Sequence, residues 1–442
     1  MDGALLRYQR KNSAAPVAVA YLLRAAGTCD LDAVRAAVRD RARTFPPLTQ
    51  RLTAGAGRAG RPTWTPQPGY DVSALVSEHP LPVDAGRAGL RAFIERRCQA
   101  TMPLDAPPWE LCLVPGPGSG EFHILFRASH IWLDGAAQHR VLGMLFGDGP
   151  PAGPGPVGPD RRDPRDETDR RDRPDGRPDP RALAVALGRV LRWATPTGGL
   201  AALSQPWSGD QIVHWETTGV ERLRALGRAY GASVNDVFLV ALSGALDGWS
   251  TPTHGRRPVH ALMPVSIRRG QEWNQLGNYV VGARVSLRRG PAAPWSRFEA
   301  VRQQTSRYRG AGNVAAGERW WFERIPARFG AAAVTLGMDS RRVPVTTSNV
   351  GLLPGPMTVA GQPITGAVPI PVLLPGQRLF VMLGAYGATA ALSLAVDGNV
   401  PAGAQLAARW LAELDRLERA AGLTTIPAQA AAVETAIAAP RR

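Results

Sequence analysis

Cysteine is scarce in this sequence, and its three copies lie far apart. Cys29, Cys98 and Cys112 are an odd number, and no two of them have the C-x-x-C spacing that zinc and redox sites use. This pattern excludes a disulfide framework as the source of stability and gives no support to a zinc site. We therefore expect reduced, mostly buried thiols without a chemical role.

Long apolar runs are missing as well. No run approaches the roughly 18 residues that a membrane-spanning helix needs. The first residues, MDGALLRYQRK, carry charges and glycine where a secretory signal needs an uninterrupted apolar stretch. The hydrophobic share of 44% beside a charged share of 20% is typical of a globular protein. We expect a cytoplasmic protein, with peripheral attachment to a membrane or to lipid bodies as an open alternative.

Lysine is nearly absent, since Lys11 is the single copy, yet the formal net charge is +16. A basic field attracts polyanions. The sequence nevertheless has no long block of like charges and no aromatic signature of an RNA-binding domain, so we expect no nucleic-acid partner. Arg, Ala, Gly and Pro are abundant together, which indicates a coding bias. A weak attraction to anionic lipid or to an acidic carrier protein stays open.

At 442 residues the chain is long enough for two packed domains. Residues 149–181 are dominated by Pro, Gly and mixed charge, and from Asp160 to Arg181 eight Arg stand against eight Asp or Glu. Such a composition cannot bury a core, so it predicts a flexible and nearly neutral linker. The expected organisation is an N-terminal lobe at 1–148, a C-terminal lobe at 182–425 and a disordered tail at 426–442.

Helices and strands alternate in both halves of the chain. Ala18–Leu23 predicts a strand, and Leu31–Phe45 predicts a helix with Asp30 as its N-cap. Phe122–Arg127 predicts a buried strand, and apolar residues at helical spacing follow it directly. The second half continues with helical spacing at 183–191, 220–230, 234–246 and 406–417, and with strand-like runs at 259–267, 279–287, 379–387 and 388–396. This alternation indicates an α/β fold class with two layered lobes.

The most informative short pattern is SHIWLDG at residues 129–135, between the predicted strand and the predicted helix. His130 would stand at a strand end where its ring can face a cleft, Asp134 could fix the loop that aims it, and Gly135 would let the chain turn into the helix. Histidine is suited to take a proton from an attacking hydroxyl or amine near neutral pH. The alternative is structural, with His130 as a hydrogen-bonded core residue and Asp134 as a helix cap.

Several further motifs follow one another in a family-like order. They are PLDAPPWEL at 103–111, SHIWLDG at 129–135, SVNDVFLVAL at 233–242, MPVSIRR at 263–269, LGNYV at 276–280 and TTSNVGLLPGP at 346–356. In this order the chain resembles bacterial wax ester synthase/diacylglycerol acyltransferases, which belong to the superfamily of peptide-synthetase condensation domains and chloramphenicol acetyltransferase. The resemblance covers nearly the whole chain.

The resemblance implies two similar chloramphenicol-acetyltransferase-like lobes with a central tunnel at their interface. His130 matches the base of the family. Asp134 matches the residue that turns away from substrate and pairs with an arginine, for which we expect Arg268. The family commonly has a second histidine directly before the base, whereas this chain has Ser129, which we consider for hydrogen bonding to substrate.

Other positions carry a functional and a structural interpretation side by side. Asn235 and Asp236 match a family pair that would line the tunnel floor or support the base, although Ser233 and Asp236 also resemble a helix capping box. Asn278 matches a position near the lobe interface, with turn formation as the alternative. The remaining candidates are Ser348 and Asn349, as substrate ligands or turn residues, and Trp109, which we expect to be a packing anchor.

The sequence therefore predicts an O-acyltransferase that moves an acyl group from acyl-CoA to a hydroxyl or amine acceptor, with His130 as general base. No G-x-S-x-G motif occurs, so we expect direct transfer without an acyl-enzyme. We expect no cofactor beyond the thioester co-substrate, and the spacing of the other histidines predicts no metal. Two alternatives stay open: a natural-product condensation enzyme that uses a carrier-protein thioester, and a non-catalytic binding partner.

Overall fold

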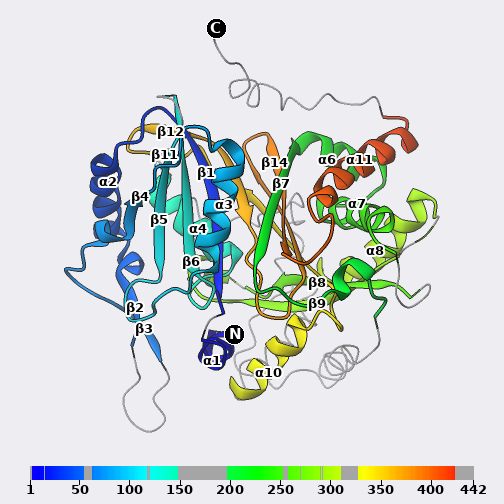
Figure 1. Cartoon of the computed structure of the whole chain (residues 1–442), viewed down its shortest axis with the longest axis horizontal. Helices are drawn as coiled ribbons and strands as arrows, with labels where there is room; N and C mark the ends of the chain where they lie inside the picture. The colour runs from blue at the N-terminus through cyan, green and yellow to red at the C-terminus, as the bar shows by residue number, and fades with distance from the viewer. Residues whose placement is uncertain are drawn as a thin grey trace.

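The computed structural model describes residues 2–13, 15–53, 62–116, 120–147, 197–251, 257–268, 270–288, 290, 292–309 and 327–423. These residues form two six-stranded sheets and one short hairpin, with helices packed against the sheets (Figure 1). The predicted α/β fold with two lobes is confirmed. The predicted linker at 149–181, the tail at 426–442 and the helical spacing at 183–191 lie outside the described residues.

The first sheet has the strand order β11-β12-β1-β6-β5-β4. Its strands are β1 (Ala18–Ala26), β4 (Val76–Glu78), β5 (Trp109–Pro115), β6 (Glu121–Ser129), β11 (Thr358–Val359) and β12 (Gln362–Ile370). The helices of this lobe are α2 (Leu31–Thr44), α3 (Gly86–Gln99) and α4 (Gly135–Phe146), with the short helices η1 (Pro46–Thr49) and η2 (Val72–Leu75) and the hairpin β2 (Gln50–Thr53) and β3 (Thr63–Pro66). Asp30 caps α2 by accepting from the backbone N–H of Ala33, as predicted.

The second sheet has the strand order β7-β14-β13-β10-β8-β9. Its strands are β7 (Gln211–Gly219), β8 (Val259–Ser266), β9 (Val280–Leu287), β10 (Val345–Leu353), β13 (Leu379–Tyr386) and β14 (Thr389–Asp397). Its helices are α6 (Val220–Ala229), α7 (Val234–Trp249), α8 (Pro294–Arg309) and α11 (Gln405–Ala420), with η4 (Ala201–Ser204) and η5 (Gly270–Asn274). The strands and helices predicted between 220 and 417 are confirmed.

The chain crosses from the second sheet into the first and returns. β10 lies inside the second sheet, whereas β11 and β12, which follow it, extend the first sheet. β12 runs antiparallel to β1, with Ala20 opposite Ile370, and β13 then re-enters the second sheet. The crossover between the lobes thus begins after β10, the strand that carries Ser348 and Asn349. Consequently residues 358–370, although they fall within the range 182–425, complete the N-terminal sheet.

Each lobe has its own apolar core. In the first lobe, Trp109, Phe126 and Leu142 belong to a cluster between the sheet and its helices. In the second lobe, most side chains of α7 are buried against the sheet and against Trp410 of α11. Burial on this scale stabilises each lobe by roughly 25 cal/mol per Å² of apolar surface removed from water. Two stable lobes provide the rigid frame for the contacts between them.

Two helices lie beside this frame, at the lower edge of the view in Figure 1. They are α1 (Asp2–Lys11) and α10 (Ala327–Met338), and they pack against each other. No single helix of the described ranges has the length and apolar character to cross a bilayer; α6 and α7 taken together meet those two criteria, but they are bent by 90° at the break between them.

Candidate active site

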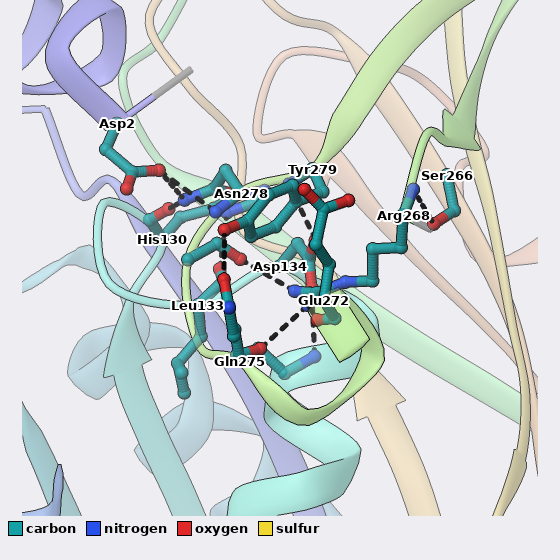
Figure 2. A network of polar contacts seen from close by, with 12 residues as sticks. Asp2, His130, Leu133, Asp134, Ser266, Arg268, Glu272, Gln275, Asn278 and Tyr279 are labelled. Carbon is teal, nitrogen blue, oxygen red and sulfur yellow. Dashed lines mark hydrogen bonds and ion pairs between the residues drawn. The ribbon is translucent and has the colours of Figure 1, made fainter. Parts of the chain in front are cut away.

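His130 directly follows β6 and stands in the turn that leads to α4 (Figure 2). Its backbone N–H donates to the carbonyl of Val17, 2.9 Å away, which continues the pairing of β1 with β6. Its ring Nδ1 lies 2.8 Å from the carbonyl oxygen of Leu133. Because a carbonyl can only accept, Nδ1 carries the proton, and the neutral ring then has an unprotonated Nε2. The half-buried His130 ring thus has its free lone pair on Nε2.

Asp134 is the N-cap of α4 and is turned into the protein. Its Oδ1 accepts from the backbone N–H of Ala137 at 2.9 Å and from Nη2 of Arg268 at 2.7 Å. Its Oδ2 accepts from the backbone N–H of Tyr279 at 2.9 Å. The side chains of Asp134 and Arg268 are 1% and 0% exposed. A carboxylate bound in this way fixes geometry and is badly placed to exchange protons with a substrate.

Arg268 is the partner that we expected for Asp134, and the ion pair joins the two lobes. Arg268 follows β8, and its guanidinium also donates to the carbonyls of Gln275 at 2.7 Å and Gly277 at 2.9 Å. The same group lies 4.6 Å from the ring centroid of Tyr279. One side chain therefore organises the loop before β9 and holds it against the start of α4 (Figure 2).

From this loop Asn278 reaches the backbone of the turn at residues 129–134, which carries His130. Its Nδ2 lies 2.7 Å from the carbonyl of His130 and 3.2 Å from that of Ile131. The residue is 7% exposed, and its Oδ1 is buried without a hydrogen-bond partner among the described residues. The predicted place near the lobe interface is confirmed. The geometry favours support of the turn over the predicted substrate contact, because the amide is directed at backbone carbonyls.

Gly135 leaves room for a neighbouring strand, which is a different role from the one we expected. Its φ is not in the positive range, so the turn itself does not require glycine. A Cβ at this position would instead lie 3.2 Å from Cγ1 of Val350. Val350 is the residue skipped where the pairing of β10 with β13 shifts register between Asn349 and Gly351. The glycine of the motif thus permits β10 to approach the start of α4 closely.

Ser129, predicted as a substrate ligand, is only 1% exposed. Its Oγ accepts from the backbone N–H of Ile131 at 3.2 Å, and its carbonyl accepts from Trp132 and Leu133. These bonds shape the turn that carries His130. The geometry therefore favours a turn-forming role for Ser129, because an enclosed hydroxyl presents no surface to a substrate.

Asp236 is buried in the second lobe and forms the capping box suggested by its spacing from Ser233. It accepts from the backbone N–H and the hydroxyl of Ser233, both at 2.9 Å, and from the hydroxyl of Thr305 on α8 at 2.7 Å. The structural interpretation of Asp236 is favoured over substrate binding. Asn235 is half-buried, and its Nδ2 donates to Sδ of Met263 at 3.4 Å.

Ser348 and Asn349 lie on β10, at the bulge next to Val350. Asn349 accepts from the backbone N–H of Gly351 at 3.1 Å, which is the local bond of a turn-forming asparagine. Ser348 is half-buried. Its predicted role as a substrate ligand stays a prediction. Trp109 is 1% exposed and donates to the carbonyl of Leu48 at 2.8 Å, which fits the packing anchor that we expected.

Sequence reasoning missed three parts of this arrangement. The carbonyl of Leu133 fixes the ring of His130, Val350 occupies the space beside Gly135, and Asp2 of α1 accepts two bonds from Asn278. No short sequence pattern predicts the direction of a backbone carbonyl or a contact between residues as far apart in the chain as Asp2 and Asn278. The described part of the chain contains no group of three or more His, Cys, Asp or Glu that could hold a metal ion.

Family models match most of the chain. The wax ester synthase/diacylglycerol acyltransferase catalytic domain matches residues 2–238, and the C-terminal domain of the same family matches residues 276–418. The chain belongs to the wax ester synthase/diacylglycerol acyltransferase family. The first match therefore includes the turn with His130, and the second includes Asn278 and β10.

The curated relatives share only about a quarter of their residues with this chain over the matched regions. A Mycobacterium tuberculosis protein, named as a candidate diacylglycerol O-acyltransferase, is 26% identical over 267 residues, which are 54% of this chain and 56% of the relative. The match thus spans little more than half of that relative. A Mycobacterium bovis protein with the same kind of name is 25% identical over 362 residues, which cover 77% of this chain and 79% of the relative.

Solved structures support the same fold. The wax ester synthase/diacylglycerol acyltransferase from Marinobacter aquaeolei VT8 has a TM-score of 0.61 at 20% identity, with 96% of this chain and 98% of that chain covered. The first condensation domain of the calcium-dependent antibiotic synthetase has a TM-score of 0.62 at 18% identity, with 95% and 94% covered. The predicted relation to condensation domains is confirmed at the level of the fold. The predicted tunnel between the lobes stays a prediction.

Proposed function

We propose that this protein transfers an acyl group from acyl-CoA to an alcohol, with His130 as the general base. The observation that carries the proposal is the 2.8 Å bond from Nδ1 of His130 to the carbonyl of Leu133, because it directs the basic lone pair to Nε2. Membership of the family supports the class of reaction. The names of the mycobacterial relatives support diacylglycerol as an acceptor to test first.

In this proposal the reaction has two stages, an attack on the thioester and the breakdown of the resulting intermediate. The acceptor oxygen attacks the thioester carbonyl carbon while Nε2 of His130 takes its proton. The carbon–sulfur bond then breaks, and the imidazolium returns the proton to the leaving thiolate, which yields ester and free CoA thiol. Asp134 and Arg268 take no proton in this scheme. They hold the turn, so that the base meets the acceptor in a productive geometry.

The experiment follows free thiol released from palmitoyl-CoA and acetyl-CoA in the presence of hexadecanol, diacylglycerol or a simple amine. We expect acceptor-dependent release by the wild type, and a loss on the order of 10²- to 10⁴-fold in His130→Ala. His79→Ala is the matched control, because His79 is a half-buried histidine of the same lobe whose ring is bonded to Ser77, outside the turn at residues 129–134.

Each result has a defined meaning. Release that requires an alcohol and disappears only in His130→Ala supports the proposed O-acyl transfer. Release that requires an amine would change the acceptor class. If no CoA ester is cleaved by folded wild-type protein, while a carrier-protein thioester is, the donor in the proposal is wrong. Equal activity of His130→Ala and wild type would overturn the role of His130.

A further inference from the structure

The first turn of α1 contacts the loop that supports residues 129–134, the turn with the proposed base His130, which we call the catalytic turn. Oδ1 of Asp2 accepts from the backbone N–H of Asn278 and from its Nδ2, both at 3.0 Å (Figure 2). The contact joins residues 276 positions apart in the chain. Hydrogen bonds to an ionised carboxylate are shorter and stronger than neutral ones. Asp2 therefore fixes both the backbone and the side chain of Asn278.

The orientation of the Asn278 amide follows from its neighbours. The carboxylate of Asp2 and the carbonyls of His130 and Ile131 are all acceptors, so each of them requires the Nδ2 side of the amide. The opposite Oδ1 is buried and has no partner among the described residues. A buried acceptor without a partner costs free energy. The bonds from Nδ2 to the charged Asp2 and to the carbonyls of His130 and Ile131 offset this cost and keep Nδ2 on the turn.

Apolar packing places α1 against the same turn. Leu5 and Leu6 of α1 belong to a buried cluster that includes Ile131, the residue after His130. On another side α1 rests on α10, where a Cβ added at Gly330 would lie 2.8 Å from Cβ of Ala4. α1 is therefore held both by the turn and by a helix that precedes β10. These two contacts hold α1 beside the turn.

We propose that Asp2 is a positioning residue of the active site and acts on His130 through Asn278. The inference rests on the proposed function, because it concerns the aim of the proposed base. His130 is anchored by its N–H on Val17 and by its ring on Leu133, and the Asp2–Asn278 pair anchors its carbonyl. A misplacement of about 1 Å can cost about 10²-fold in rate. Loss of one of three anchors should therefore lower turnover without removing the base.

The test compares Asp2→Ala, Asp2→Asn, Asn278→Ala and the double variant Asp2→Ala/Asn278→Ala in the full chain. Asp32→Ala is the control, because Asp32 also lies in a first helical turn but is 94% exposed. Two readouts are taken: kcat and KM for thiol release, and hydrogen–deuterium exchange of the backbone amides in residues 129–134. The exchange measurement does not depend on any substrate.

We expect Asp2→Ala to lower kcat about tenfold, less than the ~10²-fold effect of a full misplacement, with KM within about twofold. Asp2→Asn keeps an Oδ1 acceptor and should restore part of kcat. The double variant should be no slower than Asn278→Ala, because both changes remove one contact chain. Faster exchange in 129–134 should accompany the loss, while Asp32→Ala should match wild type in both readouts.

The outcomes separate this inference from the proposed function. Unchanged exchange in 129–134 for both Asp2→Ala and Asn278→Ala would overturn the inference, whatever the activity. Faster exchange in a protein whose wild type cleaves no thioester would support the contact chain and reject the proposed function. A rise in KM with unchanged kcat would also overturn the inference, since it would make Asp2 part of substrate binding.

Discussion

Two buried aspartates stand at the beginnings of two core helices, one in each lobe. Asp134 caps α4, and Asp236 closes the capping box of α7. Both therefore satisfy backbone donors that a helix start leaves unpaired. Asp134 also binds Arg268 and the N–H of Tyr279 from the other lobe, whereas Asp236 binds Ser233 and Thr305 of its own lobe. The same kind of helix cap thus joins the two lobes at Asp134, whereas at Asp236 it stabilises the second lobe alone.

The largest effect expected from this comparison concerns the buried ion pair. Asp134→Ala leaves the guanidinium of Arg268 buried without its carboxylate, and breaking such a pair typically costs about 4 kcal/mol. We expect a fall of this size in the free energy of unfolding, measured by urea denaturation, together with loss of acyl transfer.

In Asp134→Ala/Arg268→Met the charge of the arginine is removed as well. This variant should regain stability but not activity, and a cost below about 1 kcal/mol for Asp134→Ala would contradict the interpretation.

The two helices also differ in their expected response to acid. α4 carries His139, which is buried and bonded to the hydroxyl of Tyr21 at 2.8 Å, and burial lowers the pKa of His139 to about 4. The unfolded chain binds this proton near pH 6.5, so below that pH the unfolded state binds more protons and stability falls as the pH drops toward 4. At roughly 1.4 kcal/mol per pKa unit, His139 lowers the free energy of unfolding by about 3 kcal/mol once the pH has fallen below 4.

The measurement is the free energy of unfolding between pH 7 and pH 4. His139→Gln keeps a polar partner for Tyr21 but does not titrate, so its stability should fall less steeply over this window than that of the wild type. α7 contains no histidine, which leaves its capping box outside this effect. Parallel pH curves for wild type and His139→Gln would show that His139 is not the responsible group.

The difference between the two aspartates also explains what could be predicted. The S-x-x-D spacing around Asp236 is a local pattern, so the capping box could be predicted from the sequence alone. The pair of Asp134 with Arg268 links positions 134 residues apart, and only the resemblance to a family indicated it. Asn278 lies in the LGNYV motif, but Asp2 lies in none of the motifs, so the link between them could not be predicted from the sequence. The ring orientation of His130 depends on the direction of one backbone carbonyl, which side-chain patterns do not encode.

The smallest effect should come from Ser233→Ala, which tests whether α7 serves only its own lobe. The change removes the side-chain cap of the helix, which typically costs about 1 kcal/mol. Turnover per folded molecule should equal that of the wild type, because Ser233 bonds Asp236 and Asp236 bonds Thr305, all within the second lobe. The measurement pairs urea denaturation with initial rates of thiol release. If kcat per folded molecule falls in Ser233→Ala, the start of α7 contributes to the active site. The roles of Asp134 and Asp236 would then differ only in degree.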